Sequence, residues 1–216
     1  MKITLKNNLV KEFQEPLTIY QIGQKAFNIK EDDCWAGVID GTVWPFDLMV
    51  DFDANLEFAG KDSKYAFSII NYSAALLTSF VIYNIDNKMN LITADYTKEG
   101  FTVTFESNKK ISDFNIEAIK NSVLDKIKDK VLIKRVCFDK EIIKNVFKDN
   151  VSATNKINAL PKEQGKKCAY LIGDYFLYND YAAVNAEKIN KYEIINIEEI
   201  IDNKKTIYKV TGLAQV

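Results

Sequence analysis

The sequence contains no histidine in its 216 residues. Histidine is the commonest general base near neutral pH and the commonest metal ligand. Its absence therefore excludes imidazole-dependent hydrolysis and histidine-bound metal from the chemistry of this chain. Any catalysis would fall to serine, cysteine or carboxylate side chains without an imidazole partner.

Cysteine is scarce, with Cys34, Cys137 and Cys168 far apart in the chain. The number is odd and no Cys-x-x-Cys pair is present, which argues against a disulfide framework and against a thiolate zinc site. We therefore predict that the three cysteines are buried structural thiols.

The chain also has no excess of charge of one sign, since it contains 29 basic and 30 acidic residues. A dedicated nucleic-acid binder often carries a net positive charge, so any RNA contact here must be local, and no DNA contact is expected. No run approaches the roughly 18 consecutive apolar residues of a membrane span, and the N-terminus lacks the layout of a signal peptide. We expect a cytoplasmic protein without a membrane partner.

Apolar residues make up 47% of the chain and aromatic residues 12%, enough for a substantial core in one or two domains. In the first sixty residues, helical spacing predicts a helix over 17–27, and Asp40-Gly41 predicts a turn. Strands are predicted over 2–5, 9–13, 36–39, 42–44 and 56–58. This order is typical of a β-grasp, in which a sheet wraps across one helix.

Beyond the polar joint 60–64, helices alternate with hairpins, so we place a domain boundary there and expect an α+β protein with domains 1–62 and 63–216. The helix predicted over 72–83 is apolar on nearly every side and should be the buried spine of the second domain, against an antiparallel sheet. Strands are predicted over 91–94, 101–105, 131–138 and 169–178. A helix is predicted from a Ser112 cap to residue 128, and its inner stripe consists of Ile116, Ile119, Val123 and Ile127. A shorter helix is predicted over 139–147, capped by Asp139.

These elements and their residues resemble the N-terminal half of bacterial threonyl-tRNA synthetases. Residues 1–62 look like the TGS domain, a ubiquitin-like β-grasp, and residues 63–216 are similar to the second additional domain shared by threonyl- and alanyl-tRNA synthetases. The segments that carry the resemblance are Ile3-Thr4-Leu5, 36–41, 53–57, Tyr72-Ser73-Ala74-Ala75-Leu76, Glu99-Gly100-Phe101, 133–136, Gly173-Asp174-Tyr175-Phe176 and 208–214. In the bacterial threonyl enzymes, this second domain removes serine from wrongly charged tRNA.

The resemblance also indicates which residues that editing chemistry would need. The family helix opens with His-Ser-x-x-His, and here Tyr72 and Leu76 stand at the two histidine positions. By register, Asn179 replaces the family cysteine and Ala183 its last histidine. Because these residues cannot supply the zinc ligand set, the resemblance implies no catalytic residue, no bound metal and no cofactor. ATP would belong to a catalytic core that lies outside this sequence.

Two polar residues of the implied cleft remain, Ser73 and Asp174, which could form a hydrogen-bonded pair. Without a base they do not make a nucleophile. Tyr72 and Leu76, taken without the family, are ordinary core residues of an apolar helix. Tyrosines at 175, 178 and 181 suit either stacking on the terminal adenine of a tRNA or the core and rim of a sheet.

Local basic clusters are the candidates for tRNA contact. The candidate positions are Lys134, Arg135, Lys162, Lys166 and Lys167. Lys126, Lys128 and Lys130 extend the first group, for which a solvated helix face balanced by Glu117, Asp125 and Asp129 is the competing interpretation.

The leading hypothesis is an N-terminal accessory region of a threonine–tRNA ligase that cannot hydrolyse seryl-tRNA(Thr) and makes at most weak contact with the acceptor arm of tRNA(Thr). The remainder of the synthetase would be its partner if the chain is cut from a longer one. Two alternatives stay open: a free-standing trans-editing hydrolase, and a non-catalytic interaction module in which the TGS-like domain docks a partner.

Overall fold

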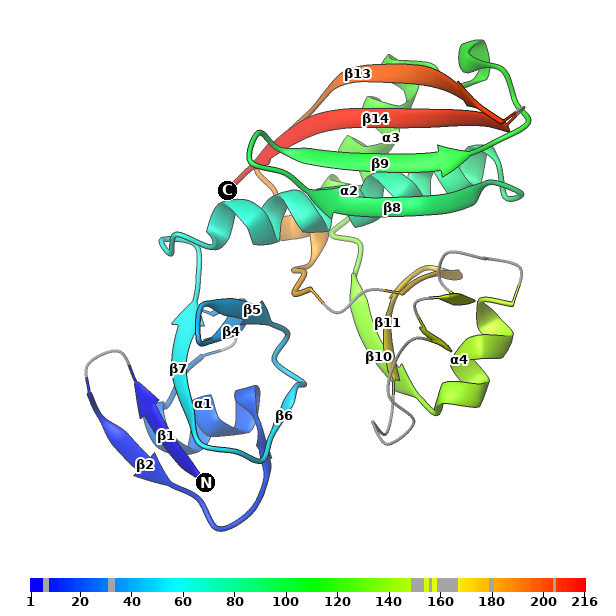
Figure 1. The fold of residues 1–216 in the computed structure, drawn as a ribbon. Helices are drawn as coiled ribbons and strands as arrows, with labels where there is room; N and C mark the ends of the chain where they lie inside the picture. Colours follow the sequence, from blue (N-terminus) through cyan, green and yellow to red (C-terminus); the bar gives the residue numbers. More distant parts are fainter. Residues whose placement is uncertain are drawn as a thin grey trace.

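The computed structural model describes residues 1–5, 8–30, 34–148, 154–155, 157–158, 167–178, 181–203 and 205–216, with Lys167 as backbone only. The described residues form a mixed fold of several sheets and four α-helices, compatible with the α+β class that the sequence predicts. Figure 1 shows three groups of elements along the chain.

The first group is a five-stranded sheet with one helix, α1 (Ile19–Phe27), against it. Its strands are β1 (Lys2–Leu5), β2 (Val10–Glu12), β4 (Ala36–Ile39), β5 (Thr42–Trp44) and β7 (Ala54–Ala59), in the order β2-β1-β7-β4-β5. β1 and β7 run parallel, and the other neighbours run antiparallel. Ile19 and Ile22 of α1 are buried against Ile3 and Leu56 of the sheet, which gives this group its own core.

The predicted helix over 17–27 begins two residues later than expected. Residues Leu17–Thr18 form the short strand β3, which pairs with β6 (Met49–Val50). Thr18 then caps α1, because its hydroxyl accepts a hydrogen bond from the Gln21 N–H while the Gln21 side chain accepts one from the Thr18 N–H.

The second group is a four-stranded antiparallel sheet covered on one face by two helices (Figure 1). The strands are β8 (Asn90–Tyr96), β9 (Phe101–Glu106), β13 (Lys191–Asp202) and β14 (Lys205–Gln215), in the order β13-β14-β9-β8. The helices are α2 (Ala66–Ile85) and α3 (Ile116–Lys128). As predicted, α2 is buried over most of its surface, and Ile119 and Val123 form the buried inner stripe of α3.

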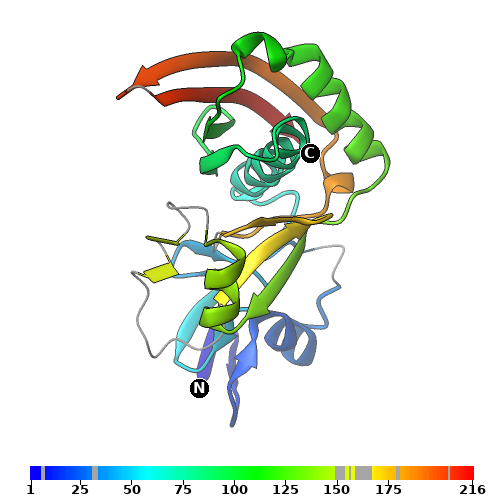
Figure 2. The same ribbon diagram turned by 90° about the vertical axis from the view of Figure 1, so that its right-hand side faces the viewer.

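The third group is a three-stranded antiparallel sheet of β10 (Lys134–Phe138), β11 (Lys167–Ile172) and β12 (Tyr175–Leu177). Helix α4 (Lys140–Val146) follows β10 and lies beside this sheet (Figure 2). A small separate core joins Ile143, Phe147, Ile157 and Ala169. Two 3-10 helices are also present, η1 (Ile111–Asp113) and η2 (Ala186–Lys188).

Several predicted boundaries are wrong for local reasons. Helix α2 begins at Ala66 rather than at residue 72. Ser112 lies in η1, and Asn115 caps α3 instead, with its Oδ1 2.9 Å from the Ala118 N–H nitrogen. The strand predicted over 169–178 is a hairpin of β11 and β12, because Gly173 has a φ of +61° and turns the chain.

α2 is long and apolar enough to cross a membrane, judged by length and composition alone, and it is the one such helix in the part of the chain that the structure describes. The prediction that no segment approaches a membrane span counted only unbroken apolar runs. It did not take into account that these 20 residues carry no charged side chain. Most of the helix is buried inside the protein, where it forms the centre of the main core, so it serves here as a core helix.

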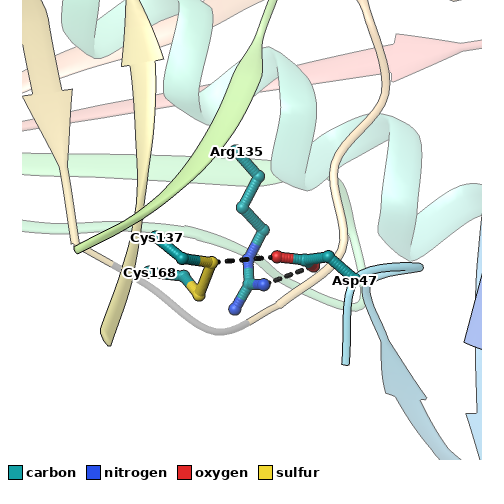
Figure 3. The surroundings of a disulfide bond; sticks show 4 residues. All are labelled: Asp47, Arg135, Cys137 and Cys168. Atoms are coloured by element: carbon teal, nitrogen blue, oxygen red, sulfur yellow. Dashed lines mark hydrogen bonds and ion pairs between the residues drawn. A yellow bond between two sulfur atoms is a disulfide. The ribbon is translucent and has the colours of Figure 1, made fainter. Parts of the chain in front are cut away.

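The prediction of three buried free thiols is wrong. Cys137 and Cys168 form a disulfide across β10 and β11 (Figure 3), while Cys34 is half-buried and takes no part in that bond. The antiparallel register places Cys137 directly opposite Cys168, with the two Cα atoms 4.0 Å apart. The spacing of 31 residues gave no sign of this pairing, because the register depends on contacts distant in sequence.

Candidate functional site

The residues expected to mark the former editing cleft lie where the middle of α2 meets the segment 181–184. Tyr72 is completely buried on α2, and its ring lies edge-on to the ring of Tyr181, with centroids 5.3 Å apart. A second edge-on contact joins Tyr72 to Tyr170 of β11, at 6.1 Å. The aromatic rings of Tyr72, Tyr170 and Tyr181, from three parts of the chain, therefore fill this contact region, which we call the Tyr72 junction.

Two buried hydroxyls fasten the segment 181–184 to the rest of the fold. The Tyr170 hydroxyl donates to the Tyr181 carbonyl at 2.6 Å and accepts from the Ala183 N–H at 3.0 Å. The Ser73 hydroxyl donates to the Ile69 carbonyl at 2.8 Å and accepts from the Val184 N–H at 2.9 Å. Because backbone groups of the segment bond to side chains of α2 and β11, its position against α2 is well defined.

Tyr181 closes the outer side of the junction. Its ring lies 4.7 Å from that of Tyr96 on β8, and its hydroxyl donates to Ser68 Oγ at 2.8 Å. Burial raises the pKa of Tyr181 well above its ordinary value of 10.0, and the Ser68 hydrogen bond offsets part of this. The phenol thus stays protonated across the physiological range and is not a general base.

The structure brings most of the predicted cleft residues together. Tyr72, Ser73 and Leu76 are buried on α2, and Ala183 lies half-buried in the facing segment. Asn179 lies outside the described residues. Tyr72 contacts Tyr181 and Ser73 contacts Val184, so this part of α2 lies against the segment 181–184.

Asp174 does not join them. It is exposed in the turn between β11 and β12, whereas Ser73 is fully buried and donates its one hydroxyl proton to Ile69. The Ser73–Asp174 pair considered from the sequence is therefore not formed. A serine whose proton is held by a helix carbonyl is a structural residue rather than a nucleophile.

A zinc ion of the kind that the family's His-Ser-x-x-His site would hold does not fit the donors present. Leu76 and Ala183 carry no ligand atom, and Tyr72 offers only a buried phenol in a packed aromatic cluster. Zinc sites in proteins use thiolate, imidazole and carboxylate donors. No step of a reaction can be routed through a metal at these described positions.

The candidate tRNA-binding residues are dispersed where the structure describes them. Lys134 is exposed at one end of β10 opposite Leu171, while the backbone of Lys167 pairs with Phe138 at the other end. Four residues along a strand separate the two positions by roughly 13 Å. Lys162, Lys166 and the side chain of Lys167 lie outside the described residues.

Arg135 has a partner within the protein. Its guanidinium forms an ion pair with Asp47, from the loop between β5 and β6, and its side chain is only 14% exposed (Figure 3). In the neighbouring cluster, Lys130 Nζ lies 3.9 Å from Glu187 Oε2. The acidic partners in these contacts are therefore Asp47 and Glu187, not the Glu117, Asp125 and Asp129 expected from the sequence.

Sequence reasoning missed the role of Tyr170. Its position on an alternating strand could have identified it as an inward-facing residue, but not its bonds to Tyr181 and Ala183. Tyr175, considered for stacking on RNA, is a core residue whose ring stacks on Tyr83 with centroids 4.4 Å apart.

Comparisons with known proteins give one consistent result. The chain is 26% identical over 176 residues to a threonine–tRNA ligase of Clostridium perfringens (strain SM101 / Type A), an alignment that covers 81% of this chain and 27% of the ligase. It is 25% identical over 182 residues to the threonine–tRNA ligase of Ligilactobacillus salivarius, an alignment that covers 83% of this chain and 28% of that ligase. The chain is related to a region of the threonine–tRNA ligases.

A more distant threonine–tRNA ligase, from Halorhodospira halophila, is 22% identical over 145 residues, covering 67% of this chain and 23% of the ligase. The chain thus spans about a quarter of the length of the ligases that it matches. No family model matches it.

Proposed function

We propose that this chain acts as an N-terminal accessory region of a threonine–tRNA ligase that does not remove serine from seryl-tRNA(Thr). Residues 1–62 would be its TGS-type β-grasp and residues 63–216 its editing-like domain, in a cytoplasmic enzyme. The similarity to threonine–tRNA ligases supports the parentage. The mixed sheet with β1 and β7 parallel and α1 on one face supports the β-grasp assignment.

The observation that carries the proposal is the packing of Tyr72. Where the family helix would present a histidine to a metal, a completely buried tyrosine fills the space against Tyr170 and Tyr181. Leu76, one turn later, is equally buried. A hydrolytic site needs a base or a metal-bound hydroxide next to an accessible ester, and neither these residues nor their packing supply one.

Contact with tRNA(Thr) in this proposal is weak. Of the candidate residues whose side chains are described, Lys134 is exposed and Arg135 is engaged by Asp47. A phosphate-binding surface needs several cations on one face, and each contact steepens the dependence of affinity on salt. We expect a shallow dependence, equivalent to one or two phosphate contacts.

A chimera tests the proposal in its working context. Two ligases with the same catalytic core are compared, one carrying this region and one carrying the corresponding region of an editing-competent threonyl enzyme, and seryl-tRNA(Thr) is measured after charging with serine. We expect serine-charged tRNA to accumulate only with this region. Equal removal of serine by both would overturn the proposal, and would favour the alternative in which this domain is a hydrolase.

A further inference from the structure

The disulfide at the junction of two structural groups has an acidic neighbour. Asp47 lies in the loop between β5 and β6 of the N-terminal group, while Cys137 and Cys168 lie on neighbouring strands of the three-stranded sheet. One carboxylate oxygen and the two sulfurs lie within 4.8 Å of one another (Figure 3). The three residues are therefore adjacent although 121 residues of sequence separate the first from the last.

We propose that, when the disulfide is reduced, the Cys137 and Cys168 thiolates and the Asp47 carboxylate bind a zinc ion that links the N-terminal group to the three-stranded sheet. Two sulfurs and one oxygen are a donor set suited to zinc, with a fourth position left for water. This site is separate from the Tyr72 junction and does not depend on the function proposed above.

The distances allow this site with little movement. Zinc bonds of about 2.3 Å to sulfur and 2.0 Å to oxygen place ligand atoms roughly 3.5 to 3.8 Å apart around one tetrahedral ion. Asp47 Oδ2 already lies 3.1 Å from Cys137 Sγ. In the disulfide that sulfur carries no hydrogen, so this approach is a contact rather than a hydrogen bond. Opening the disulfide frees both sulfurs to separate to the required spacing.

The charges also match a divalent cation. Two thiolates and one carboxylate carry three negative charges, and the Arg135 guanidinium adds one positive charge, which leaves the charge that a divalent ion neutralises. Arg135 binds Asp47 Oδ1, so Oδ2 remains directed toward the sulfurs. Hydrogen-bonded support of a ligating carboxylate is usual in metal sites. Cys137 and Asp47 are exposed, which gives the ion a way in.

Disulfide and metal exclude each other, so the site would respond to redox conditions. A phosphine reductant supplies two electrons that open the sulfur–sulfur bond, and it takes an oxygen from water as it becomes the phosphine oxide. The sulfurs are left as two thiols, which release their protons when the metal binds. Metal binding by this chain should therefore be complete only after reduction.

Cobalt(II) is the probe, because its bonds to thiolates absorb in the near ultraviolet while zinc is silent. The full chain is reduced with phosphine, its thiols are counted, and cobalt is titrated in without oxygen. We expect one cobalt per chain with a thiolate charge-transfer band, displaced by one equivalent of zinc, and no band with the oxidised chain. A fully reduced chain that gives no band would overturn the proposal.

Three variants assign the ligands, and a fourth, Cys34→Ser, is the control. Cys137→Ser and Cys168→Ser should each abolish tight binding, whereas Cys34→Ser, which removes the cysteine outside the site, should bind as the wild type does. Asp47→Asn should weaken the affinity by at least 10-fold while leaving both thiolates in place. Binding that survives Cys137→Ser or that is lost in Cys34→Ser would place the metal elsewhere and refute the assignment.

Discussion

Arg135 of β10 and Asp47 of the β5–β6 loop form an ion pair across 88 residues of sequence, and it joins the N-terminal group to the three-stranded sheet. The arginine side chain is 14% exposed and the aspartate 38%. Partial burial reduces screening by water, so this pair should couple the two groups more strongly than a typical surface pair does.

A double-mutant cycle with Asp47→Ala and Arg135→Ala measures that coupling in the oxidised chain. We expect about 1 kcal/mol from chemical unfolding, because the pair is hydrogen-bonded and partly desolvated. The exposed pair Lys25–Glu15, with nitrogen and oxygen 3.4 Å apart, provides the matched control and should show no measurable coupling. Equal coupling energies in the two cycles would contradict this account of the junction.

Asn71 on α2 should be among the most sensitive positions of the core. It is completely buried, and its side-chain amide bonds to both backbone groups of Ala214 on β14, at 2.8 and 3.1 Å. Asn71→Leu would leave two buried backbone groups unpaired and should lower the free energy of unfolding by about 2 to 4 kcal/mol. Asn84→Leu, at an exposed position of the same helix, should change it by less than about 0.5 kcal/mol. Similar losses for the two variants would count against the assigned role.

Gly100 is required by a close approach of two backbones. A Cβ atom there would lie 2.0 Å from the Gly212 carbonyl oxygen of β14, and φ is +154°. Gly100→Ala should therefore cost about 3 kcal/mol or more in unfolding free energy. Gly41 has a φ of +84° and no described atom within 4 Å of its Cβ position, so Gly41→Ala should cost only about 1 to 2 kcal/mol. Urea unfolding of the two variants checks this order.

Alkaline pH should destabilise the fold through its buried tyrosines. Burial raises the pKa of Tyr175, Tyr181 and Tyr192 above the ordinary value of 10.0. Above pH 10 the unfolded chain releases these protons while the folded chain keeps them, so the stability present below pH 10 is lost as the pH rises. Tyr175 and Tyr192, which are buried, each contribute about 1.4 kcal/mol per pH unit, and the more exposed Tyr181 contributes less.

Tyr192→Phe isolates one of these contributions. Its plot of unfolding free energy against pH should match that of the wild type in shape below pH 9 and fall less steeply above pH 10, by about 1.4 kcal/mol per pH unit. Urea unfolding between pH 8 and 11 measures both slopes. Parallel curves above pH 10 would show that Tyr192 does not titrate as described.

Features that depend on local sequence were predictable. The buried surface of α2 and the stripe of Ile119 and Val123 on α3 follow from helical periodicity, which a single segment contains. The strand β13 escaped detection because a bulge between Ile194 and Asn196 breaks its alternation. Local patterns therefore identified regular elements and failed where the backbone departs from regularity.

Features that depend on pairing between distant segments were not predictable. The disulfide requires the register that sets Cys137 opposite Cys168, and the ion pair requires Asp47 to reach Arg135 from another group of elements. At the candidate site, the substitution at Tyr72 could be read from the sequence through the family resemblance. The bonds that Tyr170 and Ser73 make to the segment 181–184 could not, since they arise from the folded arrangement.

The central claim is that the Tyr72 junction has no editing chemistry, and the hydrolysis of seryl-tRNA(Thr) by the purified chain tests it most directly. The rate is measured with added zinc, with a chelator and without protein, alongside an editing-competent threonyl enzyme as the positive control. Our account predicts that the rate with the chain equals the rate without protein under both conditions. A rate above that background, abolished by Tyr72→Phe or Ser73→Ala in folded protein, would contradict it.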